Sequence, residues 1–271
     1  MGLLAGAQVV QSAEPASNLA CSKDAGPQSP RDIAVLLPGT NTTPVKSAEP
    51  PAKMNLCNIH FHRNAEHKVT SSKTIAVKGA NIGFVCEKAD PAATKKPAQA
   101  AGATSTAGKG GESAHVKCDS VAVNDTIEVH WVFTSCPSPD KPTMEKLGNC
   151  TQCKDYVLRV EAKVFLLTDD NDKDGVDFAN FEKADGKFQP KMLPDGKGAV
   201  EYNGSTTGPS YNSVASCSPV KATWSVRPEC SPLKLSSLKS WCSTNKFGEK
   251  EAHGVRPLVT KAELLSVAQK K

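Results

Sequence analysis

One short segment, residues 58–67 (NIHFHRNAEH), carries side chains well suited to bind a metal ion. On a β-strand, successive side chains point to opposite faces, so His60 and His62 would point to the same side. Phe61 would then be buried on the opposite face. Two neutral imidazoles at this spacing supply half of the ligands of a tetrahedral zinc site.

A third histidine lies far downstream in a similar setting, within residues 127–132 (IEVHWV). Alternation places Glu128 and His130 on one face of that strand and the apolar residues on the other. A lone histidine in a strand is usually only a satisfied polar residue. An acid beside it favours a metal ligand, because metal-bound imidazoles donate their other N–H to an acceptor. Three histidines that leave one position for water are typical of a catalytic zinc. We therefore expect one zinc ion per chain, held by His60, His62 and His130.

Composition narrows the class of protein. A chain of 271 residues can form one β-rich domain with a sizeable core. The formal net charge is +5, but the basic residues are scattered among acids and form no basic stripe with interleaved aromatics. We therefore expect no nucleic-acid partner. The sequence also lacks a run of the roughly 20 apolar residues that a membrane-spanning helix needs, and it gives no indication of the oligomeric state.

Ten cysteines, an even number, are spread along the whole chain. This density indicates disulfides and an oxidising export pathway. Cys150 and Cys153 could form half of a zinc ribbon, but no second C-x-x-C motif completes it. The pairing cannot be deduced from the sequence. One arrangement, Cys86 with Cys118, would close the base of the low-complexity segment between them.

The ends and the composition suggest three segments. Residues 1–20 resemble the tail of a signal peptide followed by a disordered arm, although a basic n-region is missing. We expect a secreted, periplasmic or otherwise extracytoplasmic protein. Residues 21–271 should form one domain, interrupted by a surface insertion at 89–112 that is rich in Ala, Lys, Gly, Thr and Pro.

Strand patterns dominate the domain, which we expect to be mostly β with a minor helical part. The expected strands cover residues 56–62, 67–69, 74–77, 82–86, 116–123, 126–133, 157–167, 198–202 and 220–226. A short helix is expected within residues 257–271.

An acidic segment follows the expected strand at 157–167. Asp170, Asp172 and Asp174 imitate the first half of a calcium-binding loop. The EF-hand pattern needs a Glu at its twelfth position, where this chain has Phe181, and no flanking helices are indicated. We interpret the segment as an acidic turn, with a calcium ion at the three aspartates as the alternative.

Several motifs in order resemble those of a known family. They are residues 26–33 (GPQSPRDI), 60–62 (HFH), 66–67 (EH), 128–131 (EVHW), 204–209 (GSTTGP) and 222–224 (ATW). Together they span most of the chain and resemble carbonic anhydrases with the three-histidine zinc site of the alpha class. The interval from His62 to Glu66 is shorter than in that class, the interval from His67 to His130 is longer, and Gly208 replaces a Thr. These departures and the many cysteines favour the delta class.

The resemblance implies a fold and a reaction. The fold would be a single domain on a central, largely antiparallel β-sheet, as in alpha carbonic anhydrases. The reaction would be the reversible hydration of carbon dioxide to bicarbonate and a proton, by attack of a zinc-bound hydroxide. Carbon dioxide and bicarbonate would be the small-molecule partners.

It also implies roles for individual residues. Thr207 would accept a hydrogen bond from the hydroxide and donate one to Glu66, and Thr206 would take this role if the loop register differs by one residue. Asn58 and Glu128 would hold the rings of His60 and His130.

Three further positions take their roles from the same resemblance. His67 would be a buried, hydrogen-bonded histidine rather than a ligand. Val132 and Trp224 would line a pocket for carbon dioxide.

The last two histidines and two alternative functions complete the interpretation of the sequence. His115 and His253 are expected to be exposed and without a role. A cupin could bind a metal through His60, His62 and Glu66, although the second cupin motif is missing. The other alternative is a non-catalytic extracellular metal-binding β protein.

Overall fold

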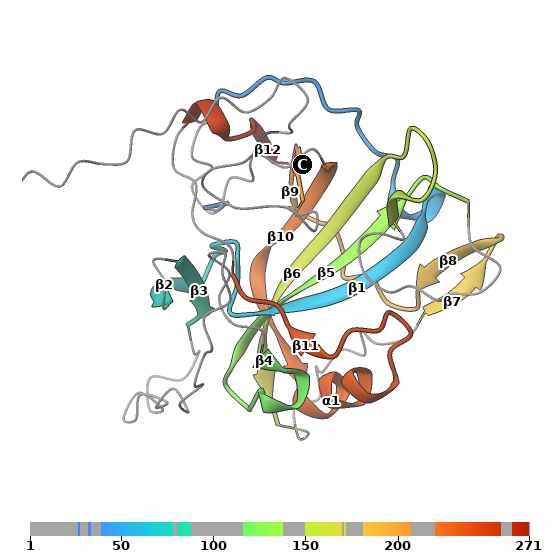
Figure 1. The fold of residues 1–271 in the computed structure, drawn as a ribbon. Coiled ribbons are helices and arrows are strands. Elements are labelled where there is room, and N and C mark those ends of the chain that lie inside the picture. The colour runs from blue at the N-terminus through green and yellow to red at the C-terminus, as the bar shows by residue number, and fades with distance from the viewer. Residues whose placement is uncertain are drawn as a thin grey trace, which may run out of the picture.

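The structure is a computed structural model, shown in Figure 1. It describes residues 27, 32–33, 39–77, 81–87, 116–137, 150–169, 171, 181–206, 220–255 and 262–270. The expected leader at residues 1–20 and the insertion at 89–112 lie outside these ranges, as do Asp170, Asp172 and Asp174.

The described residues are organised around one six-stranded sheet (Figure 1). Its strands, in spatial order, are β1 (Asn55–Arg63), β5 (Thr126–Thr134), β6 (Leu158–Thr168), β10 (Lys221–Lys234), β9 (Val200–Ser205) and β12 (Ala268–Lys270). All neighbouring strands are antiparallel except β6 and β10, which are parallel. The expectation of a mostly β fold on a central, largely antiparallel sheet is therefore confirmed.

Smaller elements surround this sheet. Two hairpins pair β2 (Ser72–Val77) with β3 (Asn81–Cys86) and β7 (Phe181–Ala184) with β8 (Lys187–Pro190), and β4 (Val116–Lys117) pairs with β11 (Glu251–Ala252). The 3-10 helices are η1 (Pro51–Lys53), η3 (Cys118–Ser120) and η5 (Ala262–Leu264), and the α-helix is α1 (Leu235–Thr244).

The sequence-based expectation missed the α-helix, and the segment where a short helix was expected contains a 3-10 helix in its described part. The α-helix α1 lies at residues 235–244, where none was expected, and it buries Leu238 and Trp241. The described part of the segment expected to be helical, residues 262–270, contains η5 and β12 instead. Only two buried apolar side chains mark the helix, so its periodic signal is weak.

A β-bulge in β1 sets which side chains face each other across the sheet. Asn55 and Leu56 pair with Thr134 and Phe133, but the register then shifts by one residue, and Asn58 pairs with Val132. As a result His60 lies opposite His130. Without the bulge, the first register would place His60 opposite Val129, on the other face of the sheet.

The two faces of the sheet differ in chemistry. The face opposite the histidines carries Phe61 and Trp131, which are both fully buried. Phe61 packs edge-on against Trp241 of α1, with ring centroids 5.8 Å apart. The predicted burial of Phe61 is thus observed, and α1 covers the apolar face behind the histidines.

The outer edge of β1 is paired rather than open. The backbone N–H of His253 donates to the carbonyl of Phe61 at 2.8 Å, and the N–H of Arg63 donates to the carbonyl of His253 at 2.9 Å. These bonds pair the carbonyl of Phe61 and the N–H of Arg63, two backbone groups on the edge of β1. They also place the C-terminal segment around β11 directly beside His62.

Four disulfides join the eight cysteines that the structure describes. The pairs are Cys57–Cys150, Cys86–Cys230, Cys118–Cys242 and Cys136–Cys153. A bridge between Cys86 and Cys118 is therefore wrong. Each instead ties a peripheral element to another part of the fold, Cys86 of β3 to β10 and Cys118 of η3 to α1.

We predict that the double variant Cys86→Ala/Cys230→Ala lowers the free energy of unfolding by about 3 kcal/mol. The reason is that a long loop, spanning 144 positions, is no longer closed in the unfolded chain. Urea unfolding of the variant and the native protein measures the difference. Mass spectrometry of the alkylated, unreduced native protein is the control, and alkylation of all ten cysteines would contradict the disulfide assignment.

Candidate metal centre

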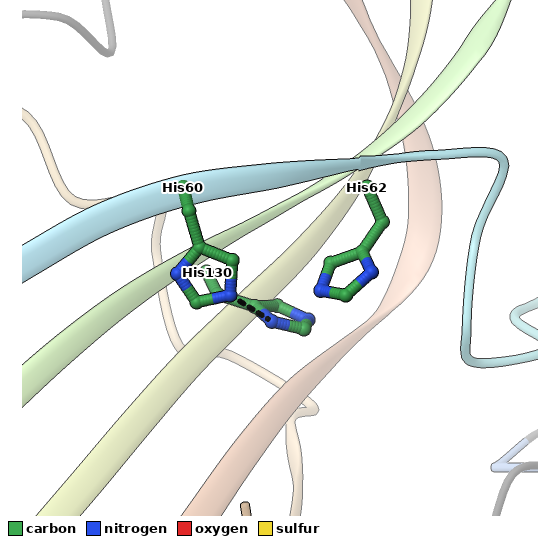
Figure 2. A group of neighbouring side chains, drawn as sticks. All are labelled: His60, His62 and His130. Atoms are coloured by element: carbon green, nitrogen blue, oxygen red, sulfur yellow. Dashed lines mark hydrogen bonds between the residues drawn. The ribbon is translucent and has the colours of Figure 1, made fainter. Parts of the chain in front are cut away.

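Three histidines from two neighbouring strands meet on one face of the sheet (Figure 2). His60 and His62 come from β1 and His130 from β5, and the pairing of His60 with His130 brings their rings together. One nitrogen from each ring lies within 4.8 Å of the other two. All three side chains are buried, with exposed fractions of 8%, 6% and 2%.

Hydrogen bonds decide which nitrogen of His60 carries the proton. Its Nδ1 lies 2.6 Å from Oδ1 of Asn58. The amide nitrogen of Asn58 donates to Glu249 at 3.0 Å, so Oδ1 is the acceptor that faces the ring. His60 therefore donates from Nδ1, and its Nε2 has a free lone pair.

The other two rings are fixed in the same way. Nδ1 of His62 lies 2.9 Å from the carbonyl oxygen of Gly254, which can only accept. Nε2 of His130 lies 2.9 Å from the carboxylate of Glu128. His62 therefore has its lone pair on Nε2 and His130 has its lone pair on Nδ1.

These assignments fit a tetrahedral metal ion. Nδ1 of His130 and Nε2 of His60 are 3.2 Å apart, and the protons of both rings are directed elsewhere. Zinc with bonds of about 2.0–2.1 Å separates two of its nitrogen ligands by about 3.3 Å. A cation shared by the lone pairs is the natural partner for such a pair of acceptors. The donor set therefore fits zinc.

Burial keeps the imidazoles in the form that binds a metal. Burial lowers the pKa of His62 to about 3 despite the attraction of Glu66, and repulsion from His130 and His253 acts in the same direction as burial. Burial also lowers the pKa of His60 well below its usual value, and repulsion from His253, His130 and His62 acts in the same direction. Neutral imidazoles are thus favoured without any metal.

Glu128 is a fully hydrogen-bonded carboxylate behind His130. One oxygen accepts the backbone N–H groups of Glu66 at 2.6 Å and His67 at 2.9 Å. The other oxygen accepts from Nδ1 of His67 at 2.6 Å and from Nε2 of His130. Burial alone would raise the pKa of Glu128, but the charge and hydrogen bonds of His67 and His130 hold that pKa well below its usual range.

His67, Glu128 and His130 also lie close enough together to be considered as a metal site. The four hydrogen bonds occupy both oxygens of Glu128, however, and Nε2 of His67 contacts the hydroxyl of Tyr202 at 2.9 Å. We therefore interpret this cluster as the support for His130. His67 is fully buried and hydrogen-bonded, in the position that the family resemblance implies.

The remaining expected site residues are only partly described. Glu66 is fully buried, and its Oε1 lies 3.6 Å from Nδ1 of His62. Thr206 is also buried, and its backbone N–H donates to the carbonyl of Val220. Thr207 and His115 lie outside the described residues.

The two expected pocket residues lie on the histidine face. Val132 follows His130 by two positions and pairs with Asn58 across the strands. Trp224 meets the ring of His130 edge-on, at 5.1 Å between centroids. Both side chains are buried, so they form an apolar wall next to His130.

The structure corrects the expectation for His253. Its ring lies 4.8 Å from that of His60 and 5.5 Å from that of His62, and its side chain is 33% exposed. Sequence reasoning also missed Glu249 and Gly254, which hold Asn58 and His62. The carbonyl group of Gly254 is part of the backbone, so the sequence gives no sign of its role. Glu249 lies nearly two hundred positions from Asn58, so no local spacing links the two residues.

The fold and the site together define a β-sheet protein with three buried histidines that could hold one metal ion. Residues 51–237 match the family model of delta carbonic anhydrases, which is more than half of the chain. The chain therefore belongs to the delta carbonic anhydrase family. This membership leaves no support for the cupin alternative, and Glu66 is not in either group of potential metal ligands among the described residues.

The chain was also compared with curated proteins and with solved structures. None of the curated proteins matches the chain. Among solved structures, the chain is similar to an alpha carbonic anhydrase from Thermovibrio ammonificans in complex with the inhibitor sulfanilamide, at 15% identity and a TM-score of 0.25. That match covers 85% of this chain and 83% of the other. In the described part of the chain, no helix is long and apolar enough to cross a membrane.

We predict that the metal-free protein loses stability as the pH falls from 6.5 toward 5. In this range the unfolded chain binds a proton at His62, whereas the folded protein, with a pKa of about 3, does not. The contribution of His62 to the free energy of unfolding is therefore complete above the ordinary histidine pKa of about 6.5 and is lost progressively below it. The loss is about 2 kcal/mol for one histidine at pH 5.

Urea unfolding of metal-free protein at pH 7 and pH 5 measures this loss. The variant His62→Gln should show a shallower dependence because it cannot bind the proton in either state. The contribution of Glu128 to stability does not interfere with this measurement. It is lost only when the pH falls below 4.5, the ordinary pKa of a glutamate. Equal stability at the two pH values would contradict the prediction.

Proposed function

We propose that this protein is a zinc enzyme that catalyses the reversible hydration of carbon dioxide to bicarbonate and a proton. The observation that carries the proposal is the convergence of three imidazole nitrogens whose ring protons are all directed to other acceptors. Membership of the delta carbonic anhydrase family supports the same reaction.

The three histidines would hold one zinc ion. When bound, zinc supplies hydroxide at neutral pH by lowering the pKa of water to about 7, a value known for carbonic anhydrases themselves. His60, His62 and His130 are neutral ligands, so they leave the charge of the dication available for this purpose. Asn58, the carbonyl of Gly254 and Glu128 keep the three rings in the required orientation.

Orientation of the nucleophile is the task proposed for Glu66 and a threonine. Glu66 is buried beside His62, where its carboxylate can accept a hydrogen bond from a threonine hydroxyl. Thr207 would donate that hydrogen bond and accept one from the attacking hydroxide, so that a lone pair points at the substrate carbon. Thr206 is the competing candidate. Val132 and Trp224 would provide an apolar surface for carbon dioxide beside His130.

We infer that the protein works in an oxidising, extracytoplasmic compartment. Four disulfides among the described residues support this inference, because such bridges do not persist in a reducing cytosol. The leader-like composition of residues 1–20 agrees with it.

We predict that His130→Ala removes both zinc and carbon dioxide hydration. Without this ring the site retains two nitrogen ligands, too few for a catalytic zinc. Metal analysis of the purified protein together with a stopped-flow hydration assay provides the measurement, and His115→Ala is the matched histidine control.

Full zinc occupancy in His130→Ala would remove His130 from the site. Zinc bound to the native protein without any hydration activity would favour a non-catalytic metal-binding protein instead.

We predict that Thr207→Ala keeps zinc but slows hydration on the order of a hundredfold. That is the usual effect of removing one preorganised hydrogen bond at a transition state. Thr206→Ala is the matched control, with the same side chain removed one position earlier. If Thr206→Ala causes the loss and Thr207→Ala does not, the roles of the two residues are exchanged.

A further inference from the structure

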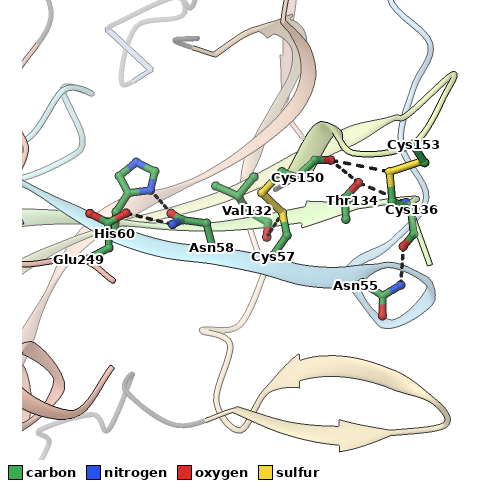
Figure 3. The surroundings of a disulfide bond; sticks show 10 residues. All are labelled: Asn55, Cys57, Asn58, His60, Val132, Thr134, Cys136, Cys150, Cys153 and Glu249. Atoms are coloured by element: carbon green, nitrogen blue, oxygen red, sulfur yellow. Dashed lines mark hydrogen bonds between the residues drawn. A yellow bond between two sulfur atoms is a disulfide. The ribbon is translucent and has the colours of Figure 1, made fainter. Parts of the chain in front are cut away.

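A partly buried carboxylate that the proposed reaction does not use lies one hydrogen-bonded step behind His60. Glu249 follows α1 in the chain, yet its side chain reaches β1 on the sheet. Its Oε1 accepts a hydrogen bond from the side-chain amide of Asn58 at 3.0 Å. Figure 3 shows the two hydrogen bonds that join Glu249 to Asn58 and Asn58 to His60. Its Oε2 lies 3.0 Å from Nε2 of His253. The side chain is 12% exposed.

One side chain, Asn245, makes several hydrogen bonds to the loop that carries Glu249. The amide oxygen of Asn245 accepts the backbone N–H groups of Phe247 and Glu249, both at 3.1 Å. Its amide nitrogen donates to the carbonyl of Glu249 at 2.8 Å and to that of Trp241 at 3.2 Å. The backbone of Glu249 is thus fixed on both sides, and its carboxylate is directed at β1 by the loop.

Asn58 needs this partner because an amide can face His60 in two ways. With Oδ1 toward the ring, Asn58 accepts the proton of Nδ1, and Nε2 of His60 is left as the free nitrogen. With the amide nitrogen toward the ring, His60 would have to accept at Nδ1, and the proton would move to Nε2, the atom directed at His130. A carboxylate only accepts, so Glu249 permits only the first orientation.

We propose that Glu249 is a positioning residue for the metal centre, acting through Asn58 to keep the lone pair of His60 on Nε2. The proposal rests on the proposed function in that the three histidines bind zinc. The tautomer of His60 would then be set by Glu249, a residue outside β1 and β5, the two strands that carry the three histidines. His253 is the second hydrogen-bond partner of Glu249 and contacts its other carboxylate oxygen.

The test is a zinc titration of the full-length protein against a competing chelator. Glu249→Ala should weaken zinc binding by about tenfold to a hundredfold, the usual effect of losing an outer partner of a ligand. Glu249→Gln can still accept from Asn58 through its amide oxygen but can also donate through its amide nitrogen, so its loss of affinity should be smaller than that of Glu249→Ala. Glu251→Gln, which removes a charge two positions along, is the control for long-range electrostatics and should match the native protein.

A double-variant cycle tests the route. In an Asn58→Ala background, Glu249→Ala should cause no additional loss, because the relay is already absent. An additional loss in the Asn58→Ala background, or a loss in Glu249→Gln equal to that in Glu249→Ala, would overturn the proposal.

Two measurements separate this inference from its premise. If the native protein binds no zinc, the proposed function fails. If the native protein binds zinc and Glu249→Ala binds it equally well, only the positioning role fails. The absorption spectrum of the cobalt-substituted Glu249→Ala variant gives a second readout, since a changed His60 ligand alters the metal geometry, and circular dichroism of the metal-free variants checks that they fold.

Discussion

The metal centre depends on a single extra residue in β1. The bulge at Cys57 shifts the register so that His60 lies across from His130 rather than from Val129. Since side chains alternate with a period of two, a slip of one residue would turn His60 and His62 to the apolar face that packs on α1. The disulfide from Cys57 to Cys150 fixes the bulged residue itself, as Figure 3 shows. Backbone register, rather than any one ligand, therefore brings the three rings together.

Burial of the carboxylates of Glu128 and Glu161 is tolerated because each carboxylate has hydrogen-bond partners. Glu128 is fully buried and accepts four hydrogen bonds, two of which come from the backbone and cannot be lost by rotation of a side chain. The opposite face of the sheet uses the same principle, since the buried carboxylate of Glu161 is shared by Arg159 and Arg227. In both places a missing partner would leave a buried charge, which costs several kcal/mol. The two clusters therefore make the central strands intolerant of polar substitutions.

The sequence revealed the parts of the site that obey a local period. The alternation in residues 60–62 and 128–130 placed His60 with His62 and Glu128 with His130, and the register shows both pairs on one face. It could not reveal the bulge, which depends on the pairing of two distant strands, or the Cys86–Cys230 bridge, which depends on how a hairpin docks. Glu249 and Gly254 were missed for the same reason. Their roles arise only from the path of the chain after α1, which brings a loop back to the edge of β1.

That path makes the candidate metal centre sensitive to residues 249–254. The carbonyl of Gly254 holds His62 and Glu249 holds Asn58, so two of the three rings depend on residues 249–254. The same segment closes the edge of β1 through His253, and the bridge from Cys118 to Cys242 fixes the helix that precedes it. An ion that binds only the assembled site stabilises every element needed to assemble it, by mass action. The proposed binding of zinc and the docking of residues 249–254 would therefore be linked equilibria, so that loosening either one would weaken the other.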